Sequence, residues 1–239
     1  MEAVTWFNEY EPFPAQWLRN LWPDATVDER SICDLRADDV RGLDRAHFFA
    51  GIGGWEYALE LAGWPRDREV WTGSCPCQPF SVAGKSKGTA DERHLWPELL
   101  RLIAIGRPAT VFGEQVVGAV GAGWLDDVFD SLEAEGYSCG AAVLGAHSVN
   151  APHRRQRIYW VADSKRVQQP RKEPRRGAPG RVGRIEQPVP WDESWESALS
   201  RLRVVDDGVP RSVPATDAVR NSIVPQVAAT FVRAFMEAE

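Results

Sequence analysis

Short apolar runs alternate along this chain with longer stretches in which apolar residues recur every three or four positions. The runs are typical of buried strands, and the longer stretches are typical of helices that cover a sheet. The predicted strands are residues 3–7, 47–50, 70–72, 109–112, 141–144 and 157–162, and the predicted helices are residues 15–21, 55–62, 95–105, 124–132 and 223–235. This alternation predicts an α/β fold with a doubly wound, mostly parallel sheet, which binds ligands at the carboxyl ends of its strands.

A glycine-rich turn follows the second predicted strand, where the sequence reads Gly51-Ile52-Gly53-Gly54. Glycines let the backbone approach a cofactor closely, and the turn directs the N-terminus of the next helix toward it. A dinucleotide-binding turn needs a further glycine where this chain has Glu56, so a nicotinamide or flavin site is disfavoured. A glycine turn that only serves packing is the alternative.

The composition fits one large domain with a small insertion, because the chain has 239 residues, of which 44% are hydrophobic and 26% charged. No run of 18 apolar residues and no basic-flanked apolar leader is present, so we expect neither a membrane span nor a secretory signal. Four scattered cysteines are too few for a disulfide framework. These features predict a cytoplasmic protein in a reducing environment.

The charge is divided unevenly. The net charge is −6, yet residues 164–190 hold eight basic and two acidic residues, which leaves 20 basic and 32 acidic residues elsewhere. A polyanion would therefore meet this acidic protein through the basic segment and local pockets. Five prolines and three glycines in the same segment exclude a long helix or a central strand. A solvated linker is the alternative.

Cys77 stands in a loop that proline constrains on both sides. Pro76 precedes it and Pro79 follows at a distance of two residues, and such a loop holds a side chain in one orientation, as a nucleophile requires. A buried, inert cysteine is the ordinary alternative. A zinc site that combines the Cys-x-Cys pair with His47 or His94 would have an unusual ligand spacing, so no metal is expected.

Three more side chains are suited to a polar heterocycle. Glu114 stands at the end of a predicted strand, where a carboxylate can protonate or hydrogen-bond a ring; a solvated glutamate is the alternative. Arg155 and Arg157 alternate just before an apolar run, so we expect them on the same face of an extended segment. Singly each would be a surface charge, but together they are suited to clamp a carbonyl or a phosphate.

These segments, in this order, resemble the motifs of the DNA cytosine-5 methyltransferase family of phages and bacteria. Residues 47–54 resemble its first motif, and residues 75–81, Cys-Pro-Cys-Gln-Pro-Phe-Ser, match its Pro-Cys-Gln motif. Four further blocks resemble the family at residues 91–93, at Glu114-Gln115-Val116, at residues 152–157 and at Asn221-Ser222 with Val224-Pro225. The resemblance covers most of the chain and implies a methyltransferase that uses S-adenosylmethionine.

The resemblance also indicates a permuted motif order. Only 23 residues separate Gly54 from Cys77, too few for the second and third motifs that the family places there. Residues 7–19 resemble the second motif and residues 30–35 the third, so both units precede the first motif here. Ser31 stands where the family has an acidic residue. The alternative is that residues 1–46 are an unrelated extension and that the cofactor site is broken.

The resemblance implies a role for each matched residue. Cys77 would add to C6 of a flipped-out cytosine, Glu114 would hold the base, and Arg157 and Arg155 would bind its O2 side or order the catalytic loop. Glu9 would accept the ribose hydroxyls, and Tyr10 would pack on the adenine. The implied cofactor contacts are Glu9, Tyr10, Ser31, Ile32, Phe49, Ala50, Gly51, Gly53, Gly54, Pro76, Trp96, Asn221 and Ser222.

We expect only a short part of the chain to recognise the target DNA. The expected organisation is a catalytic domain over residues 1–163, a basic recognition segment over residues 164–215 and a returning helix over residues 216–239. The expected contacts with double-stranded DNA are Gln78, Ser81, Arg171, Lys172, Arg175 and Arg176. Arg220 replaces the usual glycine before Asn221, which together with the short segment leaves a relaxed or lost specificity open.

The sequence thus predicts a monomeric DNA (cytosine-5-)-methyltransferase of an orphan, prophage or restriction–modification type, in the last case with a cognate endonuclease. A degenerate relic that binds DNA or cofactor without turnover, a tRNA cytosine-5 methyltransferase and a zinc-binding adaptor are the alternatives. The intact Cys77, Glu114 and Arg157 disfavour the relic.

Overall fold

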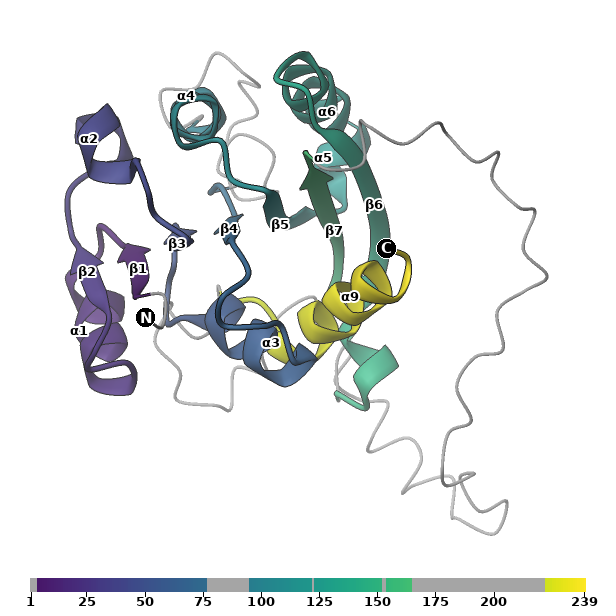
Figure 1. Ribbon diagram of the computed structural model, residues 1–239. Helices are drawn as coiled ribbons and strands as arrows, with labels where there is room; N and C mark the ends of the chain where they lie inside the picture. The colour runs from purple at the N-terminus through teal and green to yellow at the C-terminus, as the bar shows by residue number, and fades with distance from the viewer. Residues whose placement is uncertain (1–3, 77–94, 122, 152–153, 165–221) are drawn as a thin grey trace, which may run out of the picture.

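A seven-stranded sheet forms the centre of the computed structural model, which describes residues 4–76, 95–121, 123–151, 154–164 and 222–239 (Figure 1). The strand order is β2-β1-β3-β4-β5-β7-β6. The strands are β1 (Thr5–Asn8), β2 (Thr26–Asp28), β3 (Arg45–Phe48), β4 (Val70–Gly73), β5 (Thr110–Val116), β6 (Ser138–Gly145) and β7 (Gln156–Asp163). β1 to β5 pair in parallel, whereas β7 runs antiparallel to β5 and β6. The predicted α/β, mostly parallel sheet is confirmed.

Helices cover both faces of the sheet, with α2, α4 and α6 above it and α3 and α9 below it in the view of Figure 1. The helical elements are α1 (Pro12–Leu21), η1 (Ile32–Asp34), α2 (Ala37–Val40), α3 (Gly54–Ala62), α4 (Trp96–Gly106), α5 (Gly118–Gly121), α6 (Trp124–Ala134), η4 (Ala146–Val149) and α9 (Pro225–Glu237). Each face has its own apolar cluster, one around Trp71 and Trp160 and one around Phe112 and Tyr159.

Two features of the sheet differ from the sequence prediction. The three-residue strand β2 was not predicted, because this edge strand is exposed or half-buried and carries no apolar run. β5 extends to Val116, so Glu114 lies inside the strand and not just beyond its end. The extension pairs with β7, a partner some forty residues further along the chain, which a local pattern does not reveal.

A buried carboxylate ties β3 to α3 and thereby fixes the turn between them. Glu56, on α3, is fully buried. Its Oε2 accepts a hydrogen bond from Nε of Arg45 at 2.8 Å and lies 2.9 Å from Nε2 of His47, while its Oε1 accepts from Nη1 of Arg66 at 2.7 Å. Burial alone would raise the pKa of Glu56, but the bonds to His47 and Arg45 outweigh it and lower the pKa to about 2.

We predict that Glu56→Gln lowers the free energy of unfolding by about 3 kcal/mol, because it leaves Arg45 buried without a carboxylate partner. Urea denaturation measures the change. Glu60→Gln is the matched control: Glu60 is also on α3 and also binds Arg66, but it lies at the surface, so we expect a loss below about 1 kcal/mol.

The same pair of variants has a pH signature. Because the pKa of Glu56 is depressed from 4.5 to about 2, its contribution is present above the ordinary glutamate range and is lost as the pH falls toward 2. Wild-type stability should therefore fall more steeply with acid than that of Glu56→Gln. Equal losses in Glu56→Gln and Glu60→Gln, with parallel pH curves, would contradict the assignment.

Candidate active site

The turn after β3 contains glycines of two kinds. Gly51 has φ +55° and Gly53 has φ +80°, backbone conformations that residues with side chains rarely adopt. A Cβ on Gly53 would lie 2.2 Å from the Trp22 ring, so this glycine is required by packing. A Cβ on Gly51 would meet no atom within 4 Å. The turn therefore presents an open backbone at Gly51, where a ligand can approach closely.

Glu9 joins the end of β1 to this turn. Its Oε2 accepts a hydrogen bond from the Gly51 N–H at 2.6 Å, and its Oε1 accepts from the Glu11 N–H at 2.8 Å. Burial raises the pKa of Glu9, although the two N–H groups oppose the rise. Each oxygen of a carboxylate accepts more than one hydrogen bond, so Glu9 can hold the turn and still accept a pair of ligand hydroxyls.

Ser31 and Tyr10 flank Glu9 at the same edge of the sheet. β1 and β2 pair in parallel with Asn8 opposite Asp28, so the residues after both strands meet at their carboxyl ends. Ser31 begins η1, and its hydroxyl accepts from the Cys33 N–H at 3.3 Å. Ile32 is buried, whereas Tyr10 is 66% exposed and can pack on a ligand.

The C-terminal segment packs against the start of α3. A Cβ on Gly54 would lie 2.8 Å from Ile223 and 3.1 Å from the Ser222 hydroxyl, so only glycine allows this approach. Helix α9 then packs along α3. The contact places Ser222 beside the glycine turn. Asn221 lies outside the described residues.

The chain after β4 is held at the point where it enters the Cys77 segment. Ser74 accepts from the Trp55 indole N–H at 3.0 Å, and the Cys75 carbonyl accepts from Nε2 of Gln115 at 3.3 Å. Burial raises the pKa of the Cys75 thiol far above its ordinary value, so this thiol stays protonated. Gln115 had no assigned role; the signal that marks it is a buried polar position next to Glu114 in an apolar strand.

Glu114 and Arg157 meet across the β5–β7 pair. Nε of Arg157 lies 3.0 Å from Oε1 of Glu114, close enough for an ion pair, but it is not aligned for a hydrogen bond. Burial raises the pKa of Glu114, and the charges of Arg157 and Arg155 oppose the rise. Residues predicted separately are thus brought together, because the antiparallel register sets Arg157 opposite Val116.

Arg155 is not on the same extended face as Arg157, and this prediction is corrected. Arg155 precedes β7, has φ +29° and is 6% exposed. The positive φ breaks the two-residue alternation of an extended chain. Its Nη2 donates to the Ser222 carbonyl at 2.8 Å. Arg155 thus connects the neighbourhood of Glu114 to the segment beside the glycine turn.

Trp96 is a core residue, and its predicted contact with the cofactor is wrong. It is 4% exposed, and its indole N–H donates to the Ser131 hydroxyl at 3.1 Å. Its ring stands edge-on to those of Trp124 and Trp160. A large aromatic residue at the start of α4 fills the space between α4, α6 and the sheet, which leaves no surface for a ligand.

His47 is unavailable as the ligand of the alternative zinc site. Its Nδ1 lies 2.8 Å from Oγ1 of Thr72, and its Nε2 is bound to Glu56. Within the described ranges, no group of three His, Cys, Asp or Glu side chains is arranged to hold a metal ion, and no helix is long and apolar enough to span a membrane.

Several predicted site residues fall outside the residues that the structure describes. Besides Asn221, they are the proposed nucleophile Cys77 and the predicted DNA contacts Gln78, Ser81, Arg171, Lys172, Arg175 and Arg176. Pro76, the last described residue before Cys77, is exposed. Phe49 and Ala50 are half-buried in the glycine turn, where the Ala50 N–H donates to the Asn8 carbonyl at 3.1 Å.

The chain resembles known bacterial enzymes over part of their length. It is 28% identical over 154 residues to the type II methyltransferase M.HgiCII of Herpetosiphon aurantiacus, covering 47% of this chain and 35% of that protein. It is 26% identical over 167 residues to M.HhaI of Haemophilus parahaemolyticus, covering 54% and 51%. This chain therefore spans about half or less of the length of these relatives. A solved structure of DNMT2 from Spodoptera frugiperda has a TM-score of 0.48 and 18% identity, covering 71% of this chain and 45% of that one.

The C-5 cytosine-specific DNA methylase family matches residues 63–198, more than half of the chain. The matched range includes the Pro-Cys-Gln segment, the Glu114–Arg157 pair and the buried Gln115 that anchors the Cys75 carbonyl. Sequence match and site geometry agree, and the chain belongs to the C-5 cytosine-specific DNA methylase family.

Proposed function

We propose that this protein transfers a methyl group from S-adenosylmethionine to C5 of a cytosine in DNA. The observation that carries the proposal is the meeting of Glu114 and Arg157 across β5 and β7, next to the strand end that leads into Cys77. Enzymes of this family take the methyl group from S-adenosylmethionine, and the related bacterial proteins are type II methyltransferases.

The permuted order of the cofactor motifs is part of the proposal. β1 and β2, which come first in the chain, lie beside β3 in the sheet, and Glu9 binds the turn after β3. The family match begins only at residue 63, as expected if the preceding units are in an unusual order. A doubly wound sheet tolerates such an order because its strands are held by their neighbours in space.

The described residues fit S-adenosylmethionine. The open side of Gly51 accommodates a closely approaching ligand, Glu9 has acceptor capacity for ribose hydroxyls, and the exposed Tyr10 can cover the adenine. Ser222 and Gly54 would border the methionine end. Bound there, the cofactor would supply an electrophilic methyl group, and side chains of the protein would perform the remaining steps.

The proposed mechanism divides the work among three side chains. The Cys77 thiolate adds to C6 of the cytosine, which makes C5 nucleophilic. Burial raises the pKa of Glu114 and so favours the protonated acid that can donate to N3 of the ring, and Arg157 would face the O2 side. After C5 has taken the methyl group, water accepts the C5 proton, and the electron pair left at C5 forms the C5–C6 double bond and expels the Cys77 thiolate. The N3 proton returns to Glu114. Because C6 is inaccessible in a stacked duplex, the base is flipped out of it.

Arg155 has a supporting place in this mechanism. Its bond to the Ser222 carbonyl and its charge near Glu114 suit a residue that aligns the cytosine side of the site with the cofactor side. The basic part of residues 164–215 would contact phosphates of double-stranded DNA, residues 1–163 and 216–239 would form the catalytic body, and the protein would act as a cytoplasmic monomer.

Genome-wide mapping of 5-methylcytosine in a methylation-free bacterial host tests the reaction. Expression of the wild-type chain should produce methylation in a defined sequence context, and Cys77→Ser should produce none. Scattered methylation would indicate relaxed recognition by the short segment. If the folded protein leaves host DNA unmethylated but methylates tRNA, its substrate is RNA and not DNA. If it methylates neither, it is the degenerate relic.

The two neighbouring cysteines provide a matched pair of variants. Cys77→Ser should abolish transfer of a labelled methyl group to DNA, because a serine hydroxyl is not ionised at neutral pH. Cys75→Ser should keep most of the activity, because the buried Cys75 thiol is protonated in the wild type as well. The reverse result would move the nucleophile to Cys75.

The charge of Arg157 opposes the effect of burial on Glu114. Because burial raises the pKa of Glu114 and Arg157 lowers it, we predict that Arg157→Met raises that pKa further. Carboxyl ¹³C resonances of Glu114, followed by NMR against pH, report the midpoint directly. Arg154 is an exposed neighbour, so Arg154→Met should leave the titration midpoint of Glu114 unchanged. If Arg157→Met also leaves this midpoint unchanged, Arg157 has no influence on the protonation of Glu114.

Glu9 tests the contribution of the N-terminal strand. Glu9→Gln replaces one acceptor oxygen by an amide that faces the N–H group of Gly51 or Glu11. We expect the Kd of S-adenosylmethionine, measured by calorimetry, to rise about ten-fold or more. Glu11→Gln, exposed on the next turn of chain, should change it less than two-fold. Unchanged binding by Glu9→Gln would favour an unrelated N-terminal extension.

A further inference from the structure

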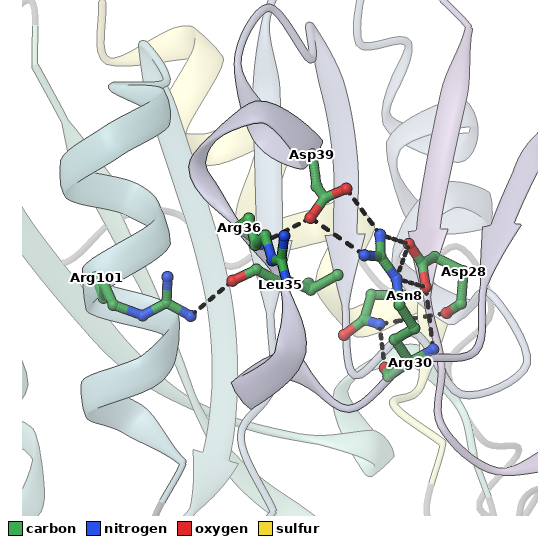
Figure 2. A network of polar contacts seen from close by, with 7 residues as sticks. All are labelled: Asn8, Asp28, Arg30, Leu35, Arg36, Asp39 and Arg101. Atoms are coloured by element: carbon green, nitrogen blue, oxygen red, sulfur yellow. Dashed lines mark hydrogen bonds and ion pairs between the residues drawn. The ribbon is translucent and has the colours of Figure 1, made fainter.

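A network of polar contacts surrounds the chain that leaves β2, and none of its side chains has a role in the proposed mechanism. Figure 2 shows it running from the end of β1 to α4 on the other side of η1. We call it the post-β2 network; its members are Asn8, Asp28, Arg30, Leu35, Arg36, Asp39 and Arg101. Its contacts lie on both sides of Ser31 and Ile32, which the family resemblance implies are cofactor contacts. Both residues follow β2 at the edge of the sheet where Tyr10 follows β1, and Tyr10 is the residue that the proposed function places over the adenine.

Asn8 orients the peptide that begins this segment. The side chain is 3% exposed, and its Nδ2 donates to the Arg30 carbonyl at 2.8 Å and to the Asp28 carbonyl at 3.2 Å. The Arg30 carbonyl and the Ser31 N–H belong to one rigid, trans peptide plane. By holding the carbonyl, Asn8 fixes the direction in which the Ser31 N–H points.

Arg30 links the end of β2 to α2. Its Nη2 lies 2.6 Å from Oδ2 of Asp28 and 2.9 Å from Oδ1 of Asp39, and Asp39 also accepts from the Arg36 N–H at 2.7 Å. The bonds to Arg30 lower the pKa of both aspartates. The Arg30 side chain is 46% exposed, so these ion pairs contribute little to stability, but their forked geometry ties β2 to α2.

Arg101 supports the segment from α4. Its Nη2 donates to the Leu35 carbonyl at 3.1 Å and, at a longer 3.4 Å, to the Ile32 carbonyl, while its Nε donates to Glu98 at 2.9 Å. The Ile32 carbonyl also accepts from the Leu35 N–H at 3.4 Å, and Leu35 directly follows η1. Arg101 therefore contacts main-chain carbonyls at the start of η1 and just after its end, and it holds this segment from the side opposite to Asn8.

We propose that Asn8 and Arg101 are positioning residues that hold Ser31 and Ile32 as the base-contacting wall of the cofactor site. The inference rests on the proposed function, since it needs S-adenosylmethionine at this edge of the sheet. Both residues act on main-chain carbonyls at opposite ends of the wall. Because the wall is fixed before the ligand binds, none of the binding free energy is used to order it. The resulting gain in affinity concerns the contacts at the adenine end alone.

Two ligands that differ only in the base test the proposal. S-adenosylhomocysteine and its hypoxanthine analogue, S-inosylhomocysteine, share the ribose and the amino-acid end. Calorimetry on the wild-type chain should give tighter binding of the adenine ligand. Arg101→Met, which keeps the aliphatic stem but removes the donors, should raise the Kd of S-adenosylhomocysteine about ten-fold and reduce the ratio between the two ligands. Arg101→Lys should recover part of both.

Controls separate positioning from a loss of fold. Arg41→Met removes an exposed arginine that pairs with Asp38 at the end of α2, and it should change neither the Kd nor the ratio. Asn8→Asp, which removes the donors at the other end without changing the shape, should reproduce the Arg101→Met result. For both positioning variants, the rate at saturating S-adenosylmethionine should stay within about two-fold of the wild type, because methyl transfer occurs at the other end of the cofactor.

Three outcomes would overturn the inference in distinguishable ways. If Arg101→Met and Asn8→Asp match Arg41→Met, the network does not act on the site. If both ligands weaken equally while the melting temperature falls, the residues only stabilise the fold. If the wild-type chain binds neither ligand, the proposed function itself fails, and the inference with it.

Discussion

The parallel pairing of β1 with β3 is the constraint on which the candidate site depends. It brings the end of β1 beside the turn after β3, so that Glu9 reaches the Gly51 N–H. β2, η1 and the post-β2 network are positioned in turn by β1. Without this pairing the glycine turn would have no carboxylate beside it, and the first forty-odd residues would have no place in the fold. A contact between segments distant in the chain thus organises one half of the site.

The buried Glu9 and Glu56 and the half-buried Glu114 show how the surroundings of a glutamate decide its role. Glu56 faces Arg45, His47 and Arg66, its pKa is lowered to about 2, and it remains a structural anion. Glu9 is met by backbone N–H groups alone, and Glu114 by an arginine that is not aligned for a hydrogen bond; burial raises the pKa of both. The carboxylates proposed to meet a ligand are therefore those whose charge is incompletely compensated within the protein.

Much of the fold was predictable from local patterns, because strands buried on both faces read as apolar runs and their covering helices as periodic stretches. The pairing partners of the strands were not predictable, because the antiparallel β5–β7 ladder that lengthens β5 joins segments that are distant in the sequence. Cys77, Glu114 and Arg157 were predicted from their sequence context and from motifs, and their roles stay predictions. The shared face of Arg155 and Arg157 and the cofactor contact of Trp96 were wrongly predicted for a common reason: alternation and motif proximity give no information about a positive φ or about burial against α6. Gln115 and Asn8 lie within matched blocks but received no role, and Arg101 lies in none; the part that each plays becomes visible only through its bonds to main-chain carbonyls.

The early position of β1 and β2 in the chain has a consequence for biosynthesis. β1, β2 and β3 are neighbours in the sheet and lie within the first fifth of the sequence. Contacts between segments close in sequence carry a smaller loop-closure entropy and form sooner. These three strands leave the ribosome before β4 does, and domains assemble from the N-terminal side during synthesis. The Glu9 side of the site can thus begin to take shape while the segment that contains Cys77 is still inside the ribosome.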